Sequence, residues 1–112
     1  MGEGNEDSEF QQKLDKVIAG LRIYDAEKGI LFGSSARGDA DQLSDIDLIV
    51  IKETDRRFLD RLADVIDAIR PDFALDVLVY TPAEFERMLA EENPLLSQAV
   101  EEGKVIYERP DS

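Results

Sequence analysis

Residues 45–51 read Asp45-Ile46-Asp47-Leu48-Ile49-Val50-Ile51 and predict a strand inside a sheet. The segment begins with strict alternation of acidic and apolar residues and ends in a continuous apolar run, rich in β-branched residues. This pattern is typical of a central strand that is buried on both faces. Because side chains alternate along a strand, Asp45 and Asp47 are expected on one face.

The sequence before this strand predicts a helix, a short strand and a loop. Ser8 and Gln11 form a capping-box pattern at the start of the helix, and Gly20 and Gly29 are alternative ends. Residues 29–32 are a short apolar strand, and residues 35–44 are small or polar, with room for one helical turn. The apolar side of the helix carries Phe10, Leu14, Val17, Ile18 and Leu21.

The sequence after this strand alternates between helices and strands. Residues 56–69 form an amphipathic helix, residues 73–80 a buried strand with Asp76 in its middle, and residues 104–107 a closing edge strand. Thr81 and Pro82 match an N-cap and the first position of a further helix, Pro94 breaks that helix, and a last helical piece runs over residues 95–102 to Gly103. We therefore expect a single domain over residues 8–108, a disordered tail at residues 1–7 and a loose tail at residues 109–112.

The composition excludes several kinds of catalytic site. The chain has 112 residues, which suits one domain, and it has neither cysteine nor histidine. Thiolate or histidine metal sites, cysteine nucleophiles and Ser-His-Asp triads are therefore excluded. Any chemistry must rest on carboxylates, hydroxyls, backbone amides, lysine and arginine.

The charge balance narrows the choice of partners. Twenty-six acidic residues against thirteen basic ones give a formal net charge of −13, which disfavours binding to duplex nucleic acid or to an anionic membrane. The charge suits a basic protein partner, bound cations or simple solubility, and these readings stay open. Without an apolar run of membrane-spanning length, a signal peptide or a transit peptide, the expected location is the cytoplasm.

Three aspartates are candidate metal ligands. Asp45 and Asp47 lie on one strand and Asp76 on another, and their convergence would cause repulsion that a cation relieves. Mg²⁺ is the natural choice, because it is held by carboxylates together with substrate phosphates, and no soft ligand is present. One or two such ions would suit an in-line displacement at phosphorus.

A phosphate-binding loop is predicted directly before the central strand. In Gly33-Ser34-Ser35, the glycine allows close approach of the backbone, and successive amides and a following helix start can face phosphate oxygens. Arg37 is a candidate to bind a phosphate through two hydrogen bonds. We also count Ser44, which precedes the first aspartate, among the candidate phosphate-binding residues.

The segment from Gly33-Ser34-Ser35-Ala36-Arg37-Gly38 to Ser44-Asp45-Ile46-Asp47-Leu48 closely resembles the signature of the DNA polymerase beta-like nucleotidyltransferase superfamily. Within it, the chain resembles the minimal nucleotidyltransferase proteins. Ala74-Leu75-Asp76-Val77 looks like the third-carboxylate strand of that family, and residues 80–85 and 102–107 resemble its C-terminal half. A glycine-serine pair, a ten-residue spacer and Asp-x-Asp form a specific pattern.

The resemblance implies an α/β (α+β) fold with a small mixed β-sheet flanked by helices. It implies that Gly33 and Ser34 touch a triphosphate, that Asp45 and Asp47 hold metal ions, and that Asp76 completes the metal site and helps deprotonate an acceptor hydroxyl. The implied reaction moves a nucleoside monophosphate from a triphosphate such as ATP to that hydroxyl and releases pyrophosphate. Such proteins are often antitoxins that nucleotidylate a HEPN-domain toxin, commonly with AMP on tyrosine, and the partner would select the acceptor.

Each candidate also has a structural interpretation. Gly33 and Ser34 can form a simple turn, and Arg37 a structural bond to the loop. Asp45 can be a strand-entry residue, with Asp47 on a solvated face. Asp76 can pair with an arginine. The arginines considered for that pairing are Arg22, Arg37 and Arg70. The tyrosines are expected to be packing residues rather than acceptors, and they are Tyr24, Tyr80 and Tyr107.

Two other functions remain as alternatives. In the first, the chain is a binding module that neutralises its partner by complex formation, and nucleotide transfer is absent or incidental. In the second, it is a stand-alone enzyme that modifies a small molecule. The lack of a domain that selects the substrate disfavours this second alternative. Asp45→Asn and Asp47→Asn separate the first alternative from catalysis, because they should abolish neutralisation only if transfer is required.

Overall fold

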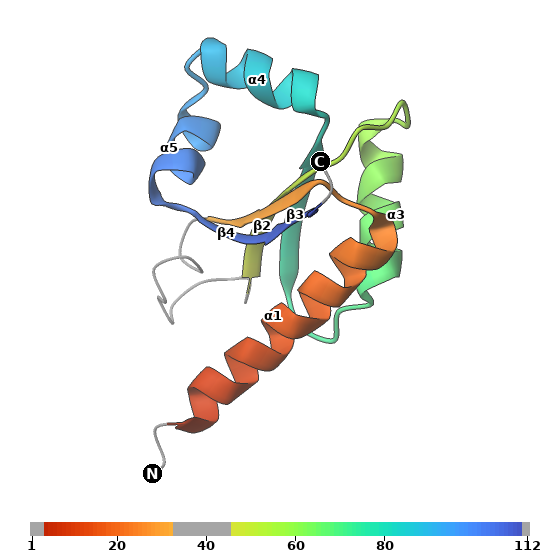
Figure 1. Ribbon diagram of the computed structural model, residues 1–112, viewed down its shortest axis with the longest axis vertical. Coiled ribbons are helices and arrows are strands. Elements are labelled where there is room, and N and C mark those ends of the chain that lie inside the picture. The colour runs from red at the N-terminus through yellow and green to blue at the C-terminus, as the bar shows by residue number, and fades with distance from the viewer. Residues whose placement is uncertain (1–3, 33–45, 111–112) are drawn as a thin grey trace.

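Strand β2 (Ile46–Ile51) lies inside a four-stranded sheet, as its sequence predicts. The computed structural model describes residues 4–32 and 46–110. The strand order is β3-β2-β1-β4, with β1 at Lys28–Leu31, β3 at Leu75–Tyr80 and β4 at Lys104–Glu108 (Figure 1). β2 pairs in parallel with β3 and antiparallel with β1, and β1 pairs antiparallel with β4. The expected mixed α/β fold is confirmed.

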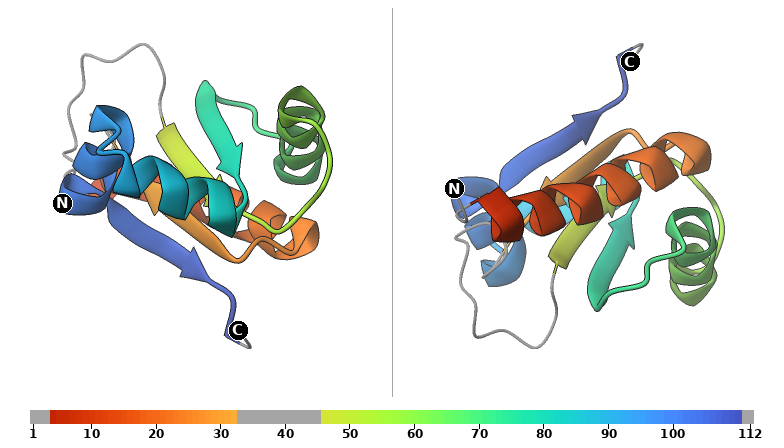
Figure 2. Two further views of the ribbon diagram at one scale, coloured as in Figure 1. Left: turned by 90° about the horizontal axis from the view of Figure 1, so that it is seen from above. Right: turned by 90° about the horizontal axis from the view of Figure 1, so that it is seen from below.

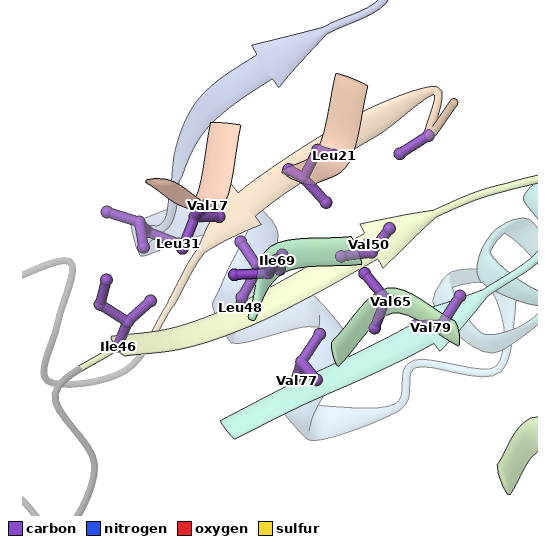
Figure 3. Packing of buried hydrophobic residues seen from close by; sticks show 11 residues of the cluster. Val17, Leu21, Leu31, Ile46, Leu48, Val50, Val65, Ile69, Val77 and Val79 are labelled. Carbon is purple, nitrogen blue, oxygen red and sulfur yellow. The ribbon is translucent and has the colours of Figure 1, made fainter. Parts of the chain in front are cut away.

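Two pairs of helices cover the two faces of this sheet (Figure 1). Helices α1 (Gly4–Tyr24) and α3 (Phe58–Ile69) pack on one face, and α4 (Pro82–Ala90) and α5 (Pro94–Glu102) on the other. Figure 3 shows the first core, in which Val17 and Leu21 of α1 and Val65 of α3 face alternate residues of β2. The intervening residues Ile49 and Ile51 belong to the second core. β2 is therefore apolar throughout its second half because both of its faces are covered.

Helix α1 passes through Gly20 and ends at Tyr24, so neither of the two expected ends, Gly20 or Gly29, is correct, and Gly29 lies in β1. Gly20 lies where α1 crosses α3, and a Cβ atom added there would lie 2.6 Å from the Cα of Ile69. The glycine therefore serves close helix packing. Asp25, which has a φ of 64°, follows the last residue of the helix. The helix begins at Gly4, ahead of the start expected at Ser8.

Strand β3 lies at an edge of the sheet, whereas its apolar sequence led us to expect a buried strand. The two residues that are most enclosed are Val77 and Val79, which face α3, while Asp76 is exposed. An edge strand that is covered on one face needs fewer apolar residues than β3 has. The apolar residues of β3 therefore predicted more burial than the structure shows. β4 forms the opposite edge, as predicted (Figure 2).

The start of α4 is held by a capping box and an ion pair. The Thr81 hydroxyl accepts from the Glu84 amide at 3.1 Å, and the Glu84 carboxylate accepts from the Thr81 amide at 3.0 Å, which confirms the predicted N-cap. Arg61 of α3 donates to both Glu84 carboxylate oxygens, at 2.8 and 3.2 Å. Arg61 is only 7% exposed, so this pair connects α3 to the opposite helix layer at the end of β3.

This ion pair predicts a loss of stability in acid. The hydrogen bond from Arg61, and then that from the Thr81 amide, hold the pKa of Glu84 below its ordinary value. Because the folded state has the lower pKa, the contribution is complete above the unfolded pKa and disappears as the pH falls through the folded pKa. Glu84→Gln is expected to cost about 1 kcal/mol at neutral pH and less in acid. Urea unfolding at both pH values measures this, and a pH-independent difference would contradict it.

Arg109, which follows β4, is bound to the residues between α1 and β1. The Arg109 amide donates to the Glu27 carbonyl at 2.9 Å, and its guanidinium lies 3.3 Å from the Asp25 carboxylate. Arg109 is thus part of the fold, at a position where we expected the loose tail to begin. Among residues 4–32 and 46–110, no helix combines the length and apolarity needed to cross a membrane.

Candidate functional site

Asp47 and Asp76 are direct neighbours across the parallel pair of β2 and β3. Each is the second residue of its strand, and the two Cα atoms are register partners. Neighbouring strands lie about 4.8 Å apart, and register partners in a parallel pair present their side chains on the same face. The structure therefore brings together two of the three predicted carboxylates. Asp47 is half-buried on the central strand, and Asp76 is exposed on the edge strand.

The order of the elements explains this juxtaposition. Helix α3 connects β2 to β3, so the two strands run in parallel and begin at the same end of the sheet. The Ile46 amide donates to the Ala74 carbonyl at 3.3 Å and aligns the two strand starts. The two aspartates share the face that α4 and α5 cover farther along the strands, where Ile49 and Ile51 follow Asp47.

The segment that carries the predicted phosphate-binding residues starts and ends beside Asp47. The Phe32 amide, one residue before Gly33, donates to the Asp47 carbonyl at 3.0 Å. Ile46, directly after Asp45, opens β2 next to Asp47. The chain therefore leaves the sheet and returns to it at the carboxylate pair.

The other predicted site residues lie outside the residues that the structure describes, as does the helical turn expected within residues 35–44. These site residues are Gly33, Ser34, Arg37, Ser44 and Asp45. Their roles stay predictions that rest on the sequence pattern.

The donors at this end of the sheet fit a hard divalent cation. Asp47 and Asp76 offer carboxylate oxygens, which Mg²⁺ prefers, and the exposed Asp76 leaves room for a ligand beside them. Within the described residues, no three acidic side chains gather closely enough to hold a metal ion. A third carboxylate at this site would therefore come from residues outside the described ranges, where Asp45 is the predicted ligand.

The structure bears on the structural interpretations of Asp76 and of the tyrosines. Among the described residues, neither Arg22 nor Arg70 forms a salt bridge with Asp76, so those two pairings are not made. Burial raises the pKa of Tyr80, with a smaller contribution from the Glu84 charge, and burial also raises that of Tyr24. Both phenols are thus harder to ionise than usual, as expected of packing residues.

The buried Arg61, which holds the end of β3 and the start of α4, was not among the predicted residues. Its side chain donates to the Val79 carbonyl at 3.3 Å as well as to Glu84. A signal was present, because Arg61 lies three residues after Phe58 and four before Val65, on the apolar side of its helix. A charged residue at such a position predicts a buried partner.

Without metal, Asp47→Asn is expected to leave the free energy of unfolding unchanged or to raise it by up to about 1 kcal/mol. The reason is that the substitution removes repulsion between neighbouring carboxylates. Thermal unfolding in the presence of a chelator measures the effect. A loss of more than about 1 kcal/mol would instead make Asp47 a structural partner.

Comparison with known proteins identifies the class to which this fold belongs. A profile described as "Nucleotidyltransferase domain" matches residues 14–107. Among solved structures, the chain resembles a candidate nucleotidyltransferase from Sulfolobus solfataricus, with a TM-score of 0.64 and 24% identity, over 100% of this chain and 96% of that one. This likeness shows a shared fold. A search of curated proteins found no match.

The chain belongs to the nucleotidyltransferase domain family, because the profile covers most of its length. Family membership and fold together support a transferase that moves nucleotidyl groups. Domains of this family generally use a nucleoside triphosphate and a divalent metal ion.

Proposed function

We propose that the chain is a Mg²⁺-dependent nucleotidyltransferase that moves a nucleoside monophosphate, AMP from ATP, onto a hydroxyl of a partner protein. The observation that carries this proposal is the pairing of Asp47 and Asp76 in register on one face of the sheet. Two adjacent carboxylates are part of what holds the metal ion that this chemistry uses, and the family membership of the chain supplies the reaction class.

The two described aspartates have different settings and therefore different proposed roles. Asp47 is half-buried on the central strand and would hold a cation in a fixed place, together with Asp45. Asp76 is exposed at the edge of the sheet, where a large acceptor can reach it. Bound Mg²⁺ would supply charge neutralisation of the triphosphate and polarisation of its phosphorus. Gly33, Ser34, Arg37 and Ser44 would bind the phosphates.

The proposed reaction is a single displacement. The acceptor oxygen forms a bond to the α-phosphorus, and the bond between that phosphorus and the oxygen bridging to the β-phosphate breaks. Asp76 accepts the hydroxyl proton, and pyrophosphate leaves with the electron pair. Asp76 therefore acts as a general base as well as a metal ligand.

We further propose that the partner is a HEPN-domain toxin and that this chain is its antitoxin. The proposal is supported by the sequence signature shared with minimal nucleotidyltransferases and by the exposure of Asp76 at a sheet edge. The exposed position suits an acceptor presented by another protein more than one enclosed in a pocket. The acidic surface also suits a basic partner.

The test is to incubate the chain and a candidate HEPN-domain partner with ATP and Mg²⁺. Intact-mass measurement of the partner should show added AMP with the unmodified chain and none with Asp47→Asn, although both form the complex. Neutralisation of the partner by Asp47→Asn as complete as that by the unmodified chain would overturn the proposal in favour of a binding module.

A further inference from the structure

Two adjoining hollows lie where α4 and α5 meet the β1 and β4 side of the sheet. One has a volume of about 380 Å³ and reaches from Ile51 to Pro82 and Glu108, and the other has a volume of about 200 Å³ and reaches from Ile30 to Val105. Both are lined by Lys28, Phe85 and Leu89, so they form one continuous groove, which we term the α4–β4 groove. In the left view of Figure 2, α4 and α5 lie over the sheet, and β4 runs along its outer edge.

The floor of the α4–β4 groove is apolar and open to solvent. Val100 of α5 is 50% exposed and Val105 of β4 is 55% exposed, and they line the groove together with Phe85 and Leu89. Exposed aliphatic side chains that line one hollow indicate a surface for another macromolecule rather than scattered surface residues. β4 pairs on one side only within the described residues, with β1, so its outer border is also open.

The rim of the groove is acidic. Glu27, Glu86 and Glu108 line its wider part, against the single cation of Lys28. Lys28 lies 3.8 Å from Glu108, but both side chains are well exposed, so this pair contributes little and one salt bridge leaves two carboxylates in excess. An apolar floor with an acidic rim is complementary to apolar side chains flanked by lysine or arginine.

We propose that the α4–β4 groove docks a basic, amphipathic segment of a partner protein. The segment places aliphatic residues against Val100 and Val105 and cationic residues at the glutamates of the rim. A second copy of this chain is a poorer occupant, because two copies with a formal charge of −13 each repel one another.

This docking surface goes beyond the proposed function and does not depend on it. The groove is lined by β1, β4, α4 and α5 and by the last residue of β2, while Asp47 and Asp76 lie at the other end of β2 and on β3. The wider hollow, which Ile51 lines, is at the far end of β2 from Asp47, whereas the smaller hollow reaches Ile30, the register partner of Ile49. Peptide binding is measured without nucleotide, so docking is followed separately from transfer activity.

The experiment uses the full chain and two labelled synthetic peptides. One peptide has leucine on one helical face and lysine on the other, and its control has glutamate in place of lysine. Fluorescence anisotropy should show that the lysine peptide binds, that binding weakens with salt, and that the glutamate peptide does not bind. Val100→Ser with Val105→Ser should weaken binding of the lysine peptide about tenfold.

Matched variants locate the binding on the surface. Glu86→Gln with Glu108→Gln should weaken binding, whereas Asp60→Asn with Asp67→Asn, which changes the net charge equally on α3, should not. Ile23→Ser with Leu59→Ser is the control for lost exposed apolar surface elsewhere. Equal effects of the groove and control variants, equal binding of both peptides, or a dimer of the free chain that Val105→Ser dissolves would each overturn the proposal.

Discussion

Replacing Gly20 by valine is expected to lower the free energy of unfolding by about 3 kcal/mol or more. A Cβ atom at this position would lie 2.6 Å from the Cα and 2.9 Å from the backbone nitrogen of Ile69. Backbone atoms cannot rotate away as the end of a side chain can, so α1 and α3 would have to separate. Separation opens the core that both helices form with β2, in which Val17, Leu21 and Val65 are fully buried.

Gly20→Ala gives the sharper test, because two effects oppose each other. Helix propensity alone favours alanine over glycine by about 1 kcal/mol. We expect the contact with Ile69 to outweigh this gain and to give a net loss of about 1 to 2 kcal/mol. Ala19→Val, at the exposed neighbouring position, is the control and should cost less than about 1 kcal/mol. A more stable Gly20→Ala protein in chemical denaturation would contradict the close crossing of α1 and α3.

Asp47→Asn is expected to lower the rate of nucleotidyl transfer by about 100-fold to 1000-fold, and Asp76→Asn should have an effect of the same order. Each substitution keeps the shape of the side chain but removes the negative charge that would hold a cation or accept a proton. The two residues lie in register on neighbouring strands, so either change damages the same site. The rate of pyrophosphate release in the presence of the acceptor measures the effect.

Asp67→Asn serves as the matched control, since Asp67 is an exposed aspartate of α3 outside the carboxylate pair. It should leave the transfer rate within about twofold of that of the unmodified chain, because α3 packs on the opposite face of the sheet and exposed charges are largely screened. If Asp47→Asn retained the full rate while remaining folded, the assignment of the site to this end of the sheet would be wrong.

The fold could be predicted where the local pattern and the tertiary environment agree. The apolar run of β2 and the Thr81-Pro82 start of α4 are such cases, and the structure confirms both. The position of β3 in the sheet could not be predicted in this way, because an apolar edge strand has a sequence like that of a buried strand. Gly20 was misinterpreted for a related reason. A glycine near a helix end is a local stop signal, and only the approach of α3 reveals its packing role.

The candidate site, too, could be predicted only in part from the sequence. Alternation indicates the face on which Asp47 and Asp76 lie, but it contains no information about register between strands that are distant in sequence. The alignment of the two aspartates depends on α3, which returns the chain to the same end of the sheet. Arg61 depends likewise on a partner in α4, twenty-three residues along the chain, that no local pattern connects to it.

The central claim is that the carboxylate pair of β2 and β3 binds a metal-nucleotide substrate. The most direct test compares the thermal midpoint of the unmodified chain with that of an Asp47→Asn, Asp76→Asn double variant, with Mg²⁺ and each nucleoside triphosphate in turn. A nucleotide at about 100 times its dissociation constant should stabilise the unmodified chain by about 2.7 kcal/mol, and only when Mg²⁺ is present. We expect this rise for ATP with the unmodified chain and none with the double variant. An equal rise in both proteins would contradict it.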